Sequence, residues 1–126
     1  MDQGKIGSGP ISFGNRKDLF GWLHAPSVQS DMPAIVICNP VGFELIRTHR
    51  AIRTLADQLA ERGYWVLRFD YRSTGDSAGN ELDSHRLHEM LRSIRDAMAT
   101  VCEFANTDRA SLIGLRLGAN LAAKIA

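Results

Sequence analysis

The feature that most constrains the fold of this chain is a short, uninterrupted apolar segment at residues 33–38, PAIVIC. Its β-branched centre and its lack of polar alternation are typical of a strand that is buried on both faces of a sheet. Such a strand needs helices on both sides to cover it. The chain can supply them, because apolar residues recur at helical spacing in residues 47–62 and 84–105.

Further strands are predicted around these helices, at residues 11–13, 19–24, 64–69 and 110–113, and a last helix begins near residue 118. The first two of these strands are expected to form a hairpin. The alternation that follows predicts an α/β fold, a mostly parallel, doubly wound sheet of about five strands with helices on both faces. We expect residues 1–126 to form a single domain, since this length suffices for one core.

The composition argues against several functional classes. A net charge of +1, with Lys and Arg scattered among the acidic residues, gives no reason to expect nucleic acid or a membrane surface as a partner. The polar first residues do not predict a signal peptide, and the longest apolar run is too short to span a bilayer. Cys38 and Cys102 lie in apolar stretches, as free thiols of a reducing compartment do, so we expect a cytoplasmic protein.

Residues 112–119, LIGLRLGA, form the most specific motif in the chain. An apolar strand runs into two spaced glycines and then a helix of small residues, which is the outline of the G-x-S-x-G turn that exposes a nucleophile above a sheet. Gly114 and Gly118 occupy the glycine positions, but Arg116 stands where the serine belongs. A guanidinium stays protonated in proteins and cannot act as a nucleophile. The motif therefore predicts the turn without the residue that would attack.

Two other segments and this motif occur in the same order along the chain as three segments of a known superfamily. Residues 35–44, IVICNPVGFE, are similar to its first oxyanion strand and loop, and residues 69–77, FDYRSTGDS, resemble its D-x-R-G-x-G-x-S loop with Ser73 in place of the first glycine. With the elbow motif, these segments resemble the N-terminal part of the α/β-hydrolase superfamily. Within it, the chain most resembles the serine-aminopeptidase-like (S33-type) hydrolases, here with arginine in place of the elbow serine.

This resemblance implies a lineage of hydrolases that act on ester or amide acyl groups. In this fold the acid and the histidine of the triad follow the nucleophile in the chain. Because the sequence ends at Ala126, we expect a domain truncated after the elbow helix. The superfamily's sheet continues beyond the strand at 110–113, so we expect an apolar edge there, which could pair two copies into a homodimer.

The resemblance also places an oxyanion hole between two loops. The elbow supplies the backbone amide of Leu117, and the loop after residue 38 supplies that of Val41, because Pro40 has no N–H. Arg116, above a helix N-terminus, would make this corner a cradle for a carboxylate or a phosphate. The alternative is that Arg116 pairs with a nearby acid, Glu44 or Asp70, and only holds loops together.

Other candidate groups carry weaker signals. Cys38 ends a strand near the expected site, but a buried packing cysteine explains it better than a nucleophile. His24 could be a turn residue, and His85 and His88 have a spacing that metal sites use, without carboxylates or cysteines to complete one. Phosphate-loop and dinucleotide motifs do not occur, so no cofactor and no metal is expected.

Two functional hypotheses follow from these patterns. One is a catalytically impaired hydrolase that retains the oxyanion hole and binds a small acyl compound. The other is a non-catalytic α/β-hydrolase-like module that uses Arg116 and the elbow helix to hold an anionic ligand or a partner's carboxylate.

Overall fold

The computed structural model describes residues 8–14, 19–28, 32–38, 43–69 and 84–114. Within them the chain forms a five-stranded sheet and two long helices. In chain order the elements are β1 (Gly9–Phe13), β2 (Leu19–His24), β3 (Ala34–Cys38), α1 (Phe43–Glu61), β4 (Val66–Phe69), α2 (Ser84–Ala105) and β5 (Ala110–Gly114). None of the described helices combines the length and the apolar character needed to cross a membrane.

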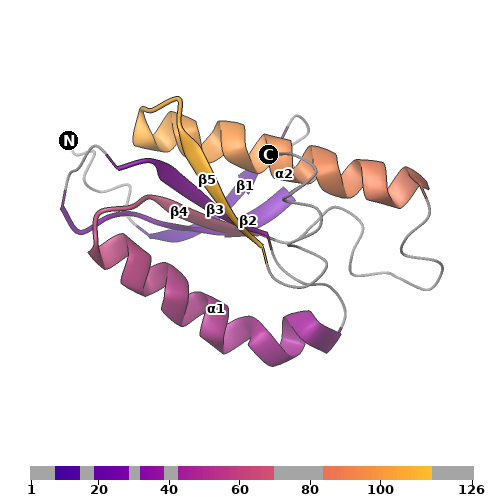
Figure 1. The fold of residues 1–126 in the computed structure, drawn as a ribbon, viewed down its shortest axis with the longest axis horizontal. Helices are drawn as coiled ribbons and strands as arrows, with labels where there is room; N and C mark the ends of the chain where they lie inside the picture. Colours follow the sequence, from indigo (N-terminus) through magenta and orange to yellow (C-terminus); the bar gives the residue numbers. More distant parts are fainter. Residues whose placement is uncertain (1–7, 15–18, 29–31, 39–42, 70–83, 115–126) are drawn as a thin grey trace.

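The strands are arranged in the order β1-β2-β4-β3-β5. The strands β4, β3 and β5 run parallel, whereas the β1–β2 hairpin joins this unit through an antiparallel pairing of β2 with β4. Helix α1 covers one face of the sheet and α2 covers the other (Figure 1). The predicted α/β fold with helices on both faces is confirmed, and the hairpin gives the sheet a mixed rather than purely parallel character.

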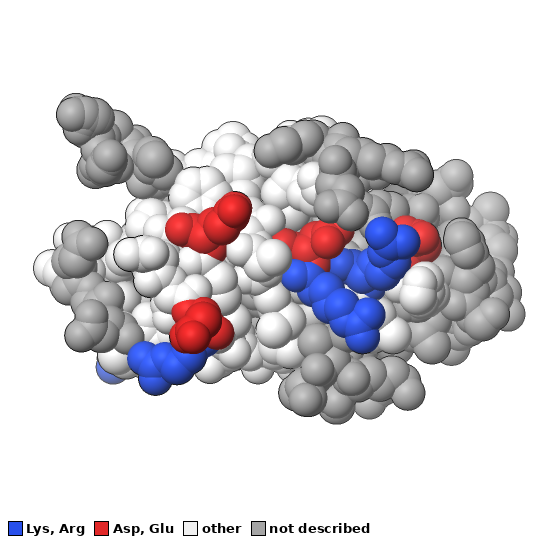
Figure 2. All heavy atoms as spheres, turned by 90° about the horizontal axis from the view of Figure 1, so that it is seen from above, with Lys and Arg blue, Asp and Glu red and all other residues white. Residues whose placement is uncertain are grey.

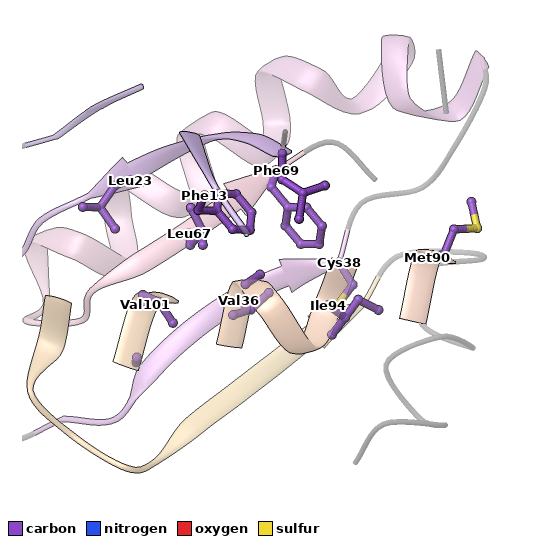
Figure 3. Packing of buried hydrophobic residues seen from close by; sticks show 12 residues of the cluster. Phe13, Leu23, Val36, Cys38, Leu67, Phe69, Met90, Ile94 and Val101 are labelled. Atoms are coloured by element: carbon purple, nitrogen blue, oxygen red, sulfur yellow. The ribbon is translucent and has the colours of Figure 1, made fainter. Parts of the chain in front are cut away.

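The two faces of the sheet bury unequal cores. The larger lies under α2, where Val36, Leu67 and Ile94 are fully buried and Phe13 packs edge-on against Phe69 (Figure 3). The smaller lies under α1 and is built from Ile35, Ile37, Ile52, Ala56 and Val66. All five residues of β3 are buried, as the apolar run at 33–38 predicts for a strand covered on both faces.

Both helices end in the same hydrogen-bonded turn. After α1 the amide of Gly63 donates to the Ala60 carbonyl and that of Tyr64 donates to the Leu59 carbonyl, with Gly63 at φ 105°. This is a Schellman motif, which requires a residue in the left-handed region. The prediction that Gly63 ends the helix is confirmed. Asn106, at φ 57°, plays the same part after α2.

Two element boundaries differ from the sequence-based expectation. Helix α1 begins at Phe43 rather than near residue 47, because nothing in the FELI sequence that opens it breaks a helix. Strand β4 begins at Val66 rather than at residue 64, because the Tyr64 amide is already bonded to the end of α1.

Among the described residues on the face seen in Figure 2, each group of basic side chains has acidic side chains next to it.

Candidate active site

The carboxyl ends of three parallel strands meet at one edge of the sheet. Cys38, the last residue of β3, is the register partner of Gly114, the last residue of β5. Phe69 ends β4, which is parallel to β3 on its other side. In open α/β sheets, ligands bind at this edge, beyond the carboxyl ends of the strands.

The connections define one particular place along that edge. From β3 the chain passes through α1 to β4 on one side, and from β4 it passes through α2 to β5 on the opposite side of β3. The two helices lie on opposite faces of the sheet (Figure 1). The strand order therefore reverses between β3 and β5, which makes their carboxyl ends a topological switch point, the usual position of a binding crevice.

The residues predicted to act there follow these strand ends in the sequence. Val41 comes shortly after Cys38, while Arg116 and Leu117 come shortly after Gly114. All three lie outside the described residues, as does Asp70. The structure therefore describes the strands from which these residues follow, and the oxyanion and anion-binding roles stay predictions.

Cys38 lies beside this edge and is unsuited to nucleophilic attack. Its side chain is fully buried in the core under α2 (Figure 3), and burial raises the pKa of its thiol to about 12. A thiol of this kind carries almost no thiolate near neutral pH. The interpretation of Cys38 as a packing residue is confirmed. Cys102 is a half-buried free thiol, more accessible than its apolar surroundings suggest.

Of the histidines whose side chains the structure describes, His24 is the one that is placed differently from the expectation, and the side chain of His85 lies outside the described residues. His24 ends β2, as the sequence predicts, but it is not an exposed turn residue, because its side chain is buried under α1. His49 and His88 are exposed. Within the described ranges, no group of three His, Cys, Asp or Glu side chains is arranged to hold a metal ion.

His24 makes two side-chain hydrogen bonds across the fold. Its Nδ1 lies 2.9 Å from an Asp57 carboxylate oxygen on α1, and Arg68 Nε on β4 donates to its Nε2 at 2.9 Å. The Arg68 guanidinium also lies over the Trp22 ring, 5.6 Å from its centroid. The sequence signal that could have revealed this cluster is Arg68, a charged residue in the otherwise apolar strand VLRF. A charge that is partly removed from water needs a partner.

The His24–Asp57 pair has the composition of a catalytic dyad but not its geometry. The nitrogen that would take a proton from a nucleophile already accepts a hydrogen bond from Arg68. His24 also pairs with Val66 at the amino end of β4, whereas the switch point lies at the carboxyl ends. The cluster is therefore separate from the candidate active site.

Comparison with solved structures assigns the class of this fold. An α/β serine hydrolase homologue from Coxiella burnetii superposes with a TM-score of 0.69 at 24% identity, covering 94% of this chain and 56% of its own. XC6422 from Xanthomonas campestris, an α/β serine hydrolase without a lid, gives a TM-score of 0.68 at 24% identity over 95% of this chain and 56% of its own. The fold is that of the α/β hydrolases.

The sequence identifies the family within that class. The model of the family described as "Esterase FrsA-like" matches residues 9–126, and the chain belongs to that family. Esterase FrsA of Yersinia pestis (strain Pestoides F) and that of Yersinia pseudotuberculosis serotype O:1b are each 33% identical over 121 residues. These alignments cover 92% of this chain but 26% of each relative, so the chain spans about a quarter of their length.

The resemblance to the α/β-hydrolase superfamily is thus confirmed. The matched family is one of esterases, and the narrower likeness to serine aminopeptidases stays a prediction.

Proposed function

We propose that this chain carries the acyl-binding corner of an esterase-like α/β hydrolase and is catalytically impaired as it stands. The observation that carries the proposal is the switch point between β3 and β5, from which the segments containing Val41, Arg116 and Leu117 continue. The ligand is a small molecule with an acyl or anionic group, contacted by the backbone amides of Val41 and Leu117 and by the guanidinium of Arg116.

The impairment follows from the chemistry of Arg116. Acyl transfer needs a nucleophile and a base, and arginine serves as neither because it keeps its proton. An oxyanion hole alone can still act, since removing triad members from serine hydrolases leaves about 10³–10⁴-fold over water. We therefore expect at most a slow turnover of activated esters, without a covalent intermediate.

A binding role is the second candidate, and Arg116 at the centre of the motif is the feature that favours it. Arginine pairs with carboxylates and phosphates through two parallel hydrogen bonds, which gives both attraction and orientation. The two candidates differ in one measurable respect, because only the hydrolase turns over an ester.

Arg116 provides the direct test of both candidates. Phosphate or acetate is expected to raise the Tm of the wild-type protein and to leave that of Arg116→Ala unchanged. At a ligand concentration of about 100 times Kd the stabilisation is about 2.7 kcal/mol, or roughly 10 °C for a domain of this size. Differential scanning fluorimetry measures the shift. Arg92→Ala, which removes an exposed arginine of α2, is the matched control and should respond like the wild type.

Equal shifts in wild type and Arg116→Ala would remove the anion-binding role. A para-nitrophenyl ester assay then separates the two functions. We expect turnover, where it is measurable, to be insensitive to a serine-directed phosphonate, because Arg116 occupies the place of the serine. Turnover abolished by the phosphonate would contradict the impairment.

We further propose that two copies associate through β5. This strand pairs with β3 on one side, and no strand pairs with its other side in the described part of the chain. Its sequence, ASLIG, has none of the charges or prolines that usually protect an edge, and Ala110 and Leu112 are half-exposed. An uncharged edge can add a second copy of itself in antiparallel register without opposing like charges.

Light scattering coupled to size-exclusion chromatography tests this association. The wild-type protein is expected to shift from monomer to dimer as its concentration rises. Ser111→Lys, which places a charge at an exposed position of β5, should hold it as a monomer. Ser12→Lys makes the same change at an exposed position of the opposite edge strand, β1, and should dimerise like the wild type. A wild-type monomer at every concentration would rule the dimer out.

A further inference from the structure

His24, Asp57 and Arg68 connect three separate elements of the fold. His24 ends β2, Asp57 lies on α1 and Arg68 lies on β4. The two hydrogen bonds to the imidazole, each 2.9 Å long, join residues far apart in the sequence. The imidazole is buried, whereas the Asp57 side chain is 55% exposed. These three residues, hereafter the His24 cluster, form a polar tie between α1 and the sheet.

The hydrogen bonds determine the protonation state of the imidazole. Arg68 Nε can only donate, so Nε2 of His24 must be the nitrogen without a proton. The proton of the neutral ring is then on Nδ1, which donates to the Asp57 carboxylate. The neutral ring thus satisfies both of its nitrogens.

A second proton breaks this arrangement. Protonated Nε2 would place an N–H against the N–H of Arg68, donor against donor and cation against cation. The charged groups facing the ring are Asp57 and Arg53 from α1 and Arg68 from β4. The strands β1 and β2 carry no other charged side chain among their described residues. Two cations therefore oppose the protonated ring, and the single carboxylate that favours it is largely exposed to solvent.

The described part of α1 packs on the sheet through few buried apolar side chains. Its fully described buried apolar side chains are Ile52, Ala56 and Ala60. Helix α2 buries a larger set in the main core, Met90, Ile94, Ala97 and Val101. Among the residues whose side chains the structure describes, α1 thus buries fewer apolar groups than α2, so a polar contact is a larger share of what holds this part of α1.

We propose that the His24 cluster is a pH-sensitive latch, which holds α1 against β2 and β4 while the imidazole is neutral and loosens α1 when the imidazole gains a proton. This device is independent of the esterase-like site, because it acts at the amino end of β4 and involves none of the residues proposed to bind ligand.

The pH range follows from the direction of the pKa shift. Burial, followed by the charge of Arg68, lowers the pKa of His24 below its ordinary value of 6.5, and Asp57 opposes this only in part. At a pH between the ordinary pKa of 6.5 and the lowered pKa of the folded state, a chain that is unfolded, or in which α1 is released, binds more protons than the latched chain. The stabilisation is therefore complete above pH 6.5 and is lost as the pH falls through the lowered pKa of the folded state.

Hydrogen exchange followed by mass spectrometry tests the latch on the full chain. After correction for intrinsic exchange rates, protection of α1 residues 50–61 is expected to fall by about tenfold for each pH unit between the two pKa values. Protection of α2 residues 88–105 should change much less. In His24→Gln, whose amide can keep both hydrogen bonds but cannot titrate, α1 protection should lose this pH dependence. The control His49→Gln, at an exposed position of α1, should keep the pH dependence of α1 protection.

Equal loss of protection in α1 and α2, or no pH dependence in the wild type, would overturn the proposal. So would a pH response that persists in a folded His24→Gln. Where that variant does not fold, the imidazole proton signals of the wild type decide by NMR. A His24 midpoint below 6.5, shared by the amide shifts of α1, supports the latch, and a midpoint at or above 6.5 contradicts it.

Discussion

Leu67→Ala is expected to lower the free energy of unfolding by about 2–5 kcal/mol, the range for truncating a fully buried leucine. Leu67 has no exposed surface. It is the register partner of Leu23 on β2 and of Val36 on β3, so it joins the hairpin to the parallel strands. Its side chain contributes to the core under α2 (Figure 3). Urea unfolding followed by circular dichroism measures the loss.

The matched control for Leu67 is Val28→Ala, which shortens an apolar side chain that is 61% exposed. Surface changes of this kind usually stay within about 0.5 kcal/mol. A loss below about 1 kcal/mol for Leu67→Ala would mean that β4 is not the centre of a packed core. Truncating a leucine in a well-packed site lowers the free energy of unfolding by about 2–5 kcal/mol.

Gly21→Ala is expected to cost about 1–3 kcal/mol, because the site has no space for a methyl group. An added Cβ would lie 2.7 Å from the Arg68 carbonyl oxygen and 3.0 Å from the Phe69 Cβ. Both atoms belong to or adjoin the backbone of β4, which is the register partner of β2 at this point. The variant must therefore push the hairpin away from the parallel strands. Thermal unfolding shows this as a lower Tm.

Gly9→Ala makes the same substitution in β1, where an added Cβ meets nothing within 4 Å. Its stability should match that of the wild type within about 0.5 kcal/mol. Equal stabilities of the Gly21 and Gly9 variants would contradict the close approach of β2 to β4. The pair therefore tests the antiparallel pairing, the part of the sheet that the alternation of strands and helices does not predict.

Local patterns in the sequence predict most of the elements. The apolar run at 33–38 predicts a doubly covered strand, and all of β3 is buried. The helical spacing of Met90, Ile94 and Val101 predicts α2, and these three side chains lie in the core. Gly63 predicts the end of α1 and adopts the required positive φ. Such signals are carried by neighbours within a few residues, so they can be detected without knowing what the segment packs against.

For the candidate site too, some features are predicted from the sequence and others depend on the tertiary structure. The prediction that Arg116 stands in place of an elbow serine comes from the sequence alone, because it rests on the spacing of Gly114 and Gly118. That β3 and β5 are neighbours, with Cys38 opposite Gly114, depends on the strand order. The order brings the carboxyl ends of β3 and β5 together at one switch point, and no local pattern predicts it.

The sequence by itself determined the α/β class, the extent of α2 and the end of α1, because periodicity and helix-ending residues are local properties of the chain. The tertiary structure alone decided that the hairpin pairs with β4 and that His24 meets Asp57 and Arg68. The reason is physical. A buried polar side chain is stable only with a partner, and which partner it finds depends on how distant segments pack.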